Sequence, residues 1–216
     1  HMKMSKGWLA AAICLAVILT DQIIKFWVKT HFYWGEDYEI ASWFHLRFIQ
    51  NNGMAFGMEL GSKLFLSVFR IVMVGLLTYY MVILSRKESV KAGYMACIAL
   101  ITAGAAGNII DCVFYGEIFS NPLPPAVAQV VPWGEGYAGL MHGMVVDMFY
   151  FPLCSWTWPD WLPWIGGDDF TFFDPVFNFA DAAISVGIVL LITCYYKTLG
   201  GTAETATQSD SDKKEA

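Results

Sequence analysis

Two carboxylates with apolar neighbours are the residues of this sequence best suited to chemistry. Asp181 lies in the stretch FNFADAAIS, three residues after Asn178 and at the start of the last long apolar run. Asp147 lies in MVVDMFYF, where β-branched and aromatic neighbours indicate a dry environment. Two carboxylates that lie close together cannot easily both ionise, so near neutral pH one holds a proton while the other acts as a base. We therefore predict that Asp147 and Asp181 form a catalytic pair that activates water.

The composition indicates an integral membrane protein. Of the 216 residues, 56% are hydrophobic and only 15% are charged, which is too apolar for an ordinary soluble domain. The net charge of -6 argues against a nucleic-acid partner, which would require a basic surface.

Four apolar runs have about the 20 residues needed to cross the hydrocarbon core of a bilayer. They are Trp8–Val28, Leu64–Leu84, Tyr94–Phe114 and Phe179–Tyr196. Lys and Arg residues are concentrated on cytoplasmic segments of membrane proteins. Here they flank one side of the runs, at Lys3, Lys6, Arg86, Lys87, Lys91, Lys197, Lys213 and Lys214. We expect both termini on the cytoplasmic side of the membrane, and the loop 115–178, which contains no Lys or Arg, on its outer side.

The outer segments contain further structure. Residues 41–56 hold a β-rich run before the turn signal Asn51-Asn52-Gly53, and this predicts a small β element. Residues 152–165 are crowded with Trp and Pro, and we expect a short amphipathic helix there on the membrane surface. The predicted fold is a membrane α protein: a four-transmembrane-helix bundle with a small extracytoplasmic β element and a short interfacial helix. Residues 3–199 form one domain, and the polar residues 200–216 form a disordered cytoplasmic tail.

Polar residues of three spans converge at one depth. At about 1.5 Å of rise per residue, Asp21 lies about 20 Å beyond Trp8, with Lys25 one turn further out. The third span also runs outward, and the fourth begins outside. Their polar residues therefore reach the same outer level as Asp147; these are Asn108, Asp111, Asn178 and Asp181. Ionisable residues within membrane spans are costly and indicate a functional site.

Each of these residues also has a structural interpretation. Asn178 and Asp181 could simply cap a helix, because an Asn three residues before an acid satisfies free backbone N–H groups. Asp21 and Lys25 could form an i,i+4 ion pair that makes both tolerable in lipid. Asn108 and Asp111 could be ordinary interhelical hydrogen-bonding groups.

The sequence predicts neither a metal site nor a disulfide framework. His142 has no second His near it, and the five cysteines show no metal-binding spacing. We expect no metal and no organic cofactor.

Five motifs together resemble the lipoprotein signal peptidase family, the type II signal peptidases of bacterial membranes. They are Asp21-x-x-x-Lys25, Asn51-x-Gly53-x-Ala55-Phe56, Gly107-Asn108-x-x-Asp111, Val146-Asp147-Met148-Phe149 and Phe177-Asn178-x-Ala180-Asp181. The resemblance implies an aspartic endopeptidase with Asp147 and Asp181 as its catalytic acids. It implies substrate-binding or scaffold roles for Asp21, Lys25, Asn51, Gly53, Asn108, Asp111, Asn178 and Ala180. Two features depart from the family pattern: Cys112 stands where the family usually has Arg, and residues 116–143 form a longer segment than usual.

The implied substrates are diacylglyceryl-modified prolipoproteins, cut before the lipidated cysteine by a monomeric enzyme in contact with membrane lipids. Sensitivity to the peptide antibiotic globomycin is a further implied property. The alternative is a small proton-coupled transporter or channel subunit, in which Asp21, Lys25, Asp111 and Asp181 form a proton relay.

Overall fold

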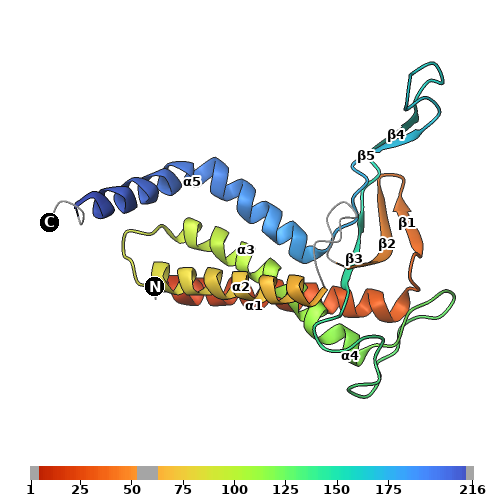
Figure 1. Ribbon diagram of the computed structural model, residues 1–216, viewed down its shortest axis with the longest axis horizontal. Helices are drawn as coiled ribbons and strands as arrows, with labels where there is room; N and C mark the ends of the chain where they lie inside the picture. The colour runs from red at the N-terminus through yellow and green to blue at the C-terminus, as the bar shows by residue number, and fades with distance from the viewer. Residues whose placement is uncertain (1–4, 53–62, 213–216) are drawn as a thin grey trace.

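A computed structural model describes residues 5–52 and 63–212, with the side chains of 197–212 left undescribed. Within these residues four helices are long and apolar enough to span a membrane, as predicted. They are α1 (Lys6–His31), α2 (Lys63–Ser85), α3 (Ala92–Ile110) with its continuation, and α5 (Phe179–Asp212). Beyond α3 the chain continues as a π-helical turn, η1 (Asp111–Tyr115), and a short helix, α4 (Gly116–Ile118). Figure 1 shows the helices side by side, with the sheets at the end opposite the N-terminus.

Helix α3 is the central helix of the bundle, because α1, α2 and α5 all pack against it. Its close contact with α5 depends on small residues. A Cβ atom added to Gly104 would lie 2.3 Å from the backbone oxygen of Ala180, and one added to Gly107 would lie 2.8 Å from Asp21 Oδ2. Small residues let membrane helices approach closely, and here they bring the polar ends of α1, α3 and α5 together.

A three-stranded antiparallel sheet covers one end of the bundle. Its strands are β1 (Asp37–Ala41), β2 (Phe44–Asn51) and β3 (Val145–Tyr150), in that order. The β-rich run before Asn51 therefore forms a strand, as predicted. Pairing of β2 with β3 places Ile49 opposite Asp147, so the sheet carries Asp147 to the bundle end.

The aromatic segment after β3 is a β-hairpin, and the expected interfacial helix was wrong for this segment. Strands β4 (Cys154–Thr157) and β5 (Asp169–Phe172) pair antiparallel, and the turn between them includes most of the residues assigned to the helix. Pro159 and Pro163 disfavour a helix here, and the alternation Cys-Ser-Trp-Thr has the two-residue period of a strand.

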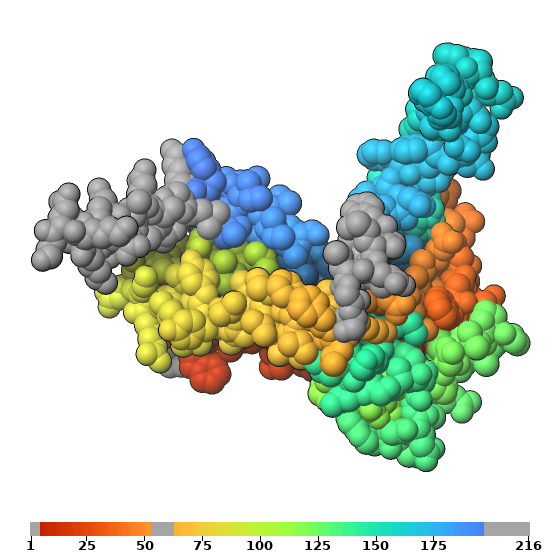
Figure 2. All heavy atoms as spheres, viewed as in Figure 1, coloured from red at the N-terminus to blue at the C-terminus, as the bar shows by residue number. Residues whose placement is uncertain are grey.

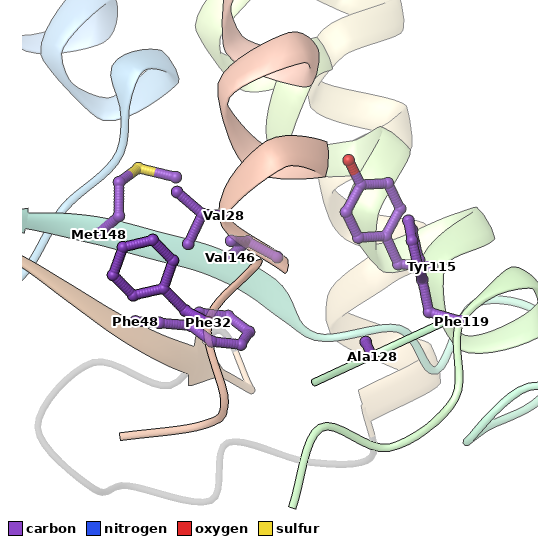
Figure 3. Close-up of a cluster of buried hydrophobic side chains, with 8 residues drawn as sticks. All are labelled: Val28, Phe32, Phe48, Tyr115, Phe119, Ala128, Val146 and Met148. Atoms are coloured by element: carbon purple, nitrogen blue, oxygen red, sulfur yellow. The ribbon is translucent and has the colours of Figure 1, made fainter. Parts of the chain in front are cut away.

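The long segment 116–143, which the sequence alone left without a role, wraps the end of α1 and contributes to a hydrophobic core. Figure 3 shows this core, in which Phe119 and Ala128 of the segment lie in one cluster with residues of α1 and the sheet. Beside them Lys29 of α1 is fully buried. Its ammonium group donates to Gln50 and lies over the rings of Phe48, Phe119 and Tyr137. Cation–π contacts of this kind partly replace the lost hydration of the ammonium group.

Helix α5 extends beyond Phe179–Tyr196, the part of it that is identified as a candidate membrane span. Its backbone stays helical to Asp212, where composition predicts a disordered tail from residue 200. The segment contains no proline to end the helix.

Candidate active site

Asp147 and Asp181 meet where the sheet contacts the start of α5. Asp147 lies in β3 and is 4% exposed, while Asp181 lies in the first turn of α5. Asn178 is fully buried and immediately precedes the helix. The side-chain Oδ1 of Asn178 accepts from the backbone N–H of Asp181 at 2.9 Å, and the backbone N–H of Asn178 donates to Asp181 Oδ2 at 3.3 Å. This reciprocal cap is the structural role considered for the pair, and it fixes the position of the Asp181 side chain.

The same Asn178 side chain reaches the other carboxylate. Its Nδ2 donates to Asp147 Oδ1 at 2.7 Å and to Asn108 Oδ1 at 3.1 Å. Asn108 in turn donates through Nδ2 to Asp181 Oδ1 at 2.8 Å. The side-chain amides of Asn108 in α3 and Asn178 before α5 thus connect the two acids.

An ion cluster lies behind this pair. Lys25 Nζ is 2.9 Å from Asp21 Oδ2 and 2.8 Å from Asp111 Oδ2, and all three side chains are fully buried. Lys25 also donates to Asn108 Oδ1 at 2.8 Å, which joins the cluster to the amides that hold the acids. Buried charges need such pairing, because the transfer of one ion from water into a protein interior costs roughly several kcal/mol. The structural interpretation of Asp21 and Lys25 as an ion pair is therefore confirmed, and Asp111 is a third member.

Backbone contacts attach the cluster to the surrounding elements. Asp21 Oδ1 accepts from the backbone N–H of Ala180 at 2.9 Å, and Asp111 Oδ2 accepts from that of Val146 at 3.1 Å. Each carboxylate therefore also positions the residue next to a catalytic candidate. Asp111 opens the π-helical turn η1, a type of turn that is common at functional sites.

Gln22 belongs to the cluster and was missed from the sequence. Its Nε2 donates to Asp111 Oδ1 at 2.9 Å and to the backbone oxygen of Gly107 at 3.1 Å, and its Oε1 accepts from Tyr115. A neutral amide beside an Asp and a Lys gives no distinct signal of its own.

The environment of Asp147 favours its protonated form. Burial, reinforced by the charge of Asp181, raises the pKa of Asp147 to about 7. Hydrogen bonds from Asn178 and Asn51, together with the charge of Lys25, act in the opposite direction and lower it. Asn51 thus contacts the site from the end of β2.

A cavity of about 300 Å³ opens beside Asp181, between α2, α3 and α5. Its walls are mainly apolar and include Phe69, Met73, Val74 and Ile184, whereas Arg70, Asn108 and Asp181 supply polar groups. The cavity therefore offers an apolar space directly beside one of the two acids.

Arg70 of α2 contacts Cys112, the residue that stands where the resemblance leads us to expect an arginine. The Nη1 of Arg70 donates to Cys112 Sγ at 3.1 Å. A guanidinium group therefore reaches this position from a different helix. The signal that could have identified Arg70 is its position within the apolar run of α2, because a basic residue there is costly.

Of the other residues singled out from the sequence, Gly53 falls outside the described residues. His142 lies away from this network: it is exposed, with its ring contacting the backbone oxygen of Leu140. Among the side chains that the structure describes, in residues 5–52 and 63–196, no group of three or more His, Cys, Asp or Glu could hold a metal ion.

The chain is similar to a known family along most of its length. The family model described as signal peptidase (SPase) II matches residues 13–197. The lipoprotein signal peptidase of Porphyromonas gingivalis is 49% identical over 197 residues, which cover 91% of this chain and 87% of that protein. The lipoprotein signal peptidase of Amoebophilus asiaticus is 35% identical, over 87% of this chain and 77% of that protein.

The fold also resembles that of a solved bacterial membrane enzyme, determined by the in meso method at 1.9 Å resolution. The TM-score is 0.56 at 24% identity, with 85% of this chain and 89% of the other chain covered. Together with the four apolar helices, this supports a multi-pass membrane protein. The chain belongs to the signal peptidase II family and is an aspartic peptidase of lipoprotein processing.

Proposed function

We propose that this protein removes signal peptides from diacylglyceryl-modified prolipoproteins by cutting before the lipidated cysteine, with Asp147 and Asp181 activating water. The observation that carries this proposal is the connection of the two acids through Asn178 and Asn108. The proposal is also supported by the environment of Asp147, because burial and the charge of Asp181 raise the pKa of this carboxyl to about 7 and so favour a proton on it.

The proposed reaction uses the two acids in complementary roles. The Asp181 carboxylate takes a proton from water while the resulting hydroxide attacks the scissile carbonyl carbon, and protonated Asp147 donates its proton to the carbonyl oxygen. The tetrahedral intermediate then collapses, the C–N bond breaks, and the leaving nitrogen takes up the proton held by Asp181. Asp147 recovers its proton from the intermediate's hydroxyl, so the pair returns to its starting state.

The cavity beside Asp181 fits a substrate that is partly lipid. Its apolar walls suit a hydrocarbon chain or an apolar side chain, and Asp181 lies in its lining. Arg70 lies in the same lining, and its guanidinium group can donate to backbone carbonyls of the substrate. A substrate that is anchored in the same bilayer is already held near the site, which lowers the entropy cost of orientation.

The other site residues serve as scaffold in this proposal. Asp21, Lys25 and Asp111 hold the helices in register, and Asn51, Asn108 and Asn178 position the two acids. Ala180 contributes backbone near the substrate, and Gly53 keeps its proposed role as a substrate-binding or scaffold residue. Globomycin is expected to compete with substrate for the same cavity.

The proposed orientation places both termini in the cytoplasm and the active site at the outer face of the inner membrane. Lys6 donates to the backbone oxygens of Lys87 and Glu88, so the basic N-terminal segment and the basic α2–α3 loop lie at one end of the bundle. The candidate active site lies toward the other end (Figure 1). This arrangement follows the distribution of basic residues expected for a cytoplasmic end.

The alternative of a proton relay has less support. Lys25, Asp21 and Asp111 pair with one another at one level of the bundle and do not form a path along it. The relay also leaves Asp147 without a role, whereas membership of a peptidase family accounts for it.

The proposal is tested with purified protein in nanodiscs and a synthetic prolipoprotein peptide, with and without the diacylglyceryl group on its cysteine. Mass spectrometry of the products identifies the cut bond. We expect cleavage of the modified peptide alone, with the lipidated cysteine as the new N-terminal residue. Equal cleavage of the unmodified peptide, or a cut at another bond, would contradict the proposed specificity.

A further inference from the structure

The β4–β5 hairpin has one apolar face and one polar face. In the observed register, Cys154 pairs with Phe172 and Trp156 with Phe170, while Ser155 pairs with Thr171 and Thr157 with Asp169. Side chains of a strand alternate between its two faces. One face therefore carries Cys154, Trp156, Phe170 and Phe172, and the other carries Ser155, Thr157, Asp169 and Thr171.

Contacts across the strands confirm the two faces. On the polar face Thr157 donates to Asp169 at 2.6 Å, and the hydroxyls of Ser155 and Thr171 are 3.1 Å apart. On the apolar face the rings of Trp156 and Phe170 lie 4.6 Å apart between centroids. Each face is thus ordered by its own cross-strand pairs.

The apolar face has no protein layer over it within the described residues. Trp156 is 40% exposed and Phe172 is 55% exposed. The turn is more exposed still, since Trp161 is 79% and Trp164 is 98% exposed. An isolated two-stranded hairpin is at best marginally stable in water, so an uncovered aromatic face requires a partner.

The position of the hairpin indicates what that partner is. It projects from the bundle end at which α5 begins, both sideways and obliquely away from the helices (Figure 1), and stands apart from the rest of the molecule (Figure 2). Only six residues, 173–178, separate β5 from the membrane helix α5. At about 3.3 Å per residue they hold the base of the hairpin within about 20 Å of the start of that span.

The composition of the hairpin also matches a membrane interface. Tryptophan is enriched where hydrocarbon meets headgroups, because its ring is apolar and its indole N–H is polar. The segment contains four tryptophans, Trp156, Trp158, Trp161 and Trp164, and no Lys or Arg. Its charged residues are carboxylates, of which Asp169 lies on the polar face, so attraction to anionic headgroups has no part in the contact.

We propose that the β4–β5 hairpin is a membrane anchor, whose apolar face lies against the headgroup–hydrocarbon boundary of the bilayer that the four helices span. Lipid is its partner, and the turn tryptophans enter the interface. This anchor holds β3, and with it Asp147, at a fixed height above the bilayer. The inference rests on the membrane-spanning fold and does not depend on the proposed cleavage reaction.

The test uses the natural difference between two adjacent residues. Cys154 lies on the apolar face and Ser155 on the polar face. In a background with Cys14→Ala and Cys194→Ala, a nitrobenzoxadiazole fluorophore is attached to Cys154 of the full chain in phosphatidylcholine nanodiscs. The matched control carries Cys154→Ala and Ser155→Cys and is labelled in the same way. Quenching is measured with lipid-borne nitroxides and, separately, with a water-soluble paramagnetic reagent.

We expect lipid nitroxides to quench the label at residue 154 several-fold more than the label at residue 155, and the aqueous reagent to show the opposite order. Replacement of Trp161 and Trp164 by Ser should reduce the lipid quenching at residue 154. Strong aqueous quenching at both positions would show that the hairpin stands in water. A label at residue 154 that is shielded from both quenchers would show that protein covers this face, and either result would overturn the proposal.

Discussion

The amide of Asn178 lies 2.7 Å from the carboxylate of Asp147, although the two residues belong to a helix start and a strand separated by the whole β4–β5 hairpin. Asn178 therefore does more than cap α5. It fixes one acid through its side-chain Nδ2 and the other through its backbone N–H and Oδ1.

We predict that Asn178→Ala lowers cleavage without unfolding the protein, because Asp147 loses a donor that favours its charged form. The pKa of Asp147 then rises further, and the high-pH limb of the kcat/KM profile should move to higher pH. The profile is measured with the lipidated peptide. As a control, Asn121→Ala changes an amide of the outer loop 116–143. An Asn178→Ala profile that matches the wild-type profile in height and position would contradict this role.

Cleavage by the wild-type protein should fall as pH rises through about 7, where Asp147 loses its proton. The groups that face Asp147 are Asp181, which raises its pKa, and Asn178, Asn51 and Lys25, which lower it. A rate that stays constant from about pH 6 to 9 would show that a protonated Asp147 is not required.

The same pKa predicts a pH dependence of stability. The folded-state pKa of Asp147 lies above the ordinary value of 3.8, so between about pH 4 and 7 the folded protein holds a proton that the unfolded chain has released. Stability should therefore decline as pH rises through this window. Asp147→Asn removes this contribution. The difference between the Tm of the variant and the Tm of the wild type should therefore increase in favour of the variant as pH rises from about 4 to 7. A constant difference in Tm across this range would argue against the raised pKa.

Loss of Lys25 should destabilise the protein strongly, because Lys25→Met leaves Asp21 and Asp111 buried without their cation. Removing one partner of a buried ion pair typically costs about 3–5 kcal/mol. The triple variant Asp21→Asn, Lys25→Met, Asp111→Asn should recover much of the lost Tm. If Lys25→Met alone melts like the wild type, the cluster does not hold the helices together.

Contact between α3 and α5 should be sensitive to one added methyl group. Gly104→Ala places a Cβ 2.3 Å from the backbone oxygen of Ala180, which forces α5 and its Asp181 away from Asn108. We expect a loss of about 1–3 kcal/mol and a lower cleavage rate. Gly75→Ala in α2 is the matched control, since its Cβ would meet no atom within 4 Å. Equal behaviour of the two variants would show that close packing at Gly104 is unimportant.

The membrane spans and the site were predictable where one physical rule dominated. Span length and basic flanks identify the four helices, and counting residues along each span places Asp21, Asn108 and Asp181 at a common depth. Depth alone does not fix the rotation of a helix about its axis, however. For this reason the contact of Arg70 with Cys112 could not be predicted, although Arg70 was visible in the sequence.

Other features depend on tertiary contacts that leave no local pattern. Gln22 belongs to the site only because its side chain donates to Asp111 of another helix. Burial of Lys29 depends on the rings of Phe119 and Tyr137, which come from the distant segment 116–143. In the β4–β5 hairpin, tryptophans occupy both the strands and the turn, so aromatic content obscured the two-residue alternation. That local ambiguity explains why a helix was predicted there.

Arg70 can be tested by moving its guanidinium group. Arg70→Ala should lower kcat/KM about tenfold, the size of one charge-assisted hydrogen bond of about 1.4 kcal/mol. Adding Cys112→Arg to this variant should restore part of the activity, because the new arginine starts from the residue that Arg70 contacts. Arg70→Lys keeps the charge but lacks the planar fork, and should recover less. Wild-type kcat/KM in Arg70→Ala would exclude a role in substrate positioning.

The central claim is that Asp147 and Asp181 together activate water, and the most direct measurement is single-turnover cleavage of the diacylglyceryl peptide by Asp147→Asn and Asp181→Asn. Asp160→Asn, which changes an exposed carboxylate of the hairpin turn, serves as the control. We predict that each site variant folds and binds substrate but cleaves at least about 100-fold more slowly, while the control cleaves at the wild-type rate. Near-wild-type cleavage by either folded site variant would contradict the account.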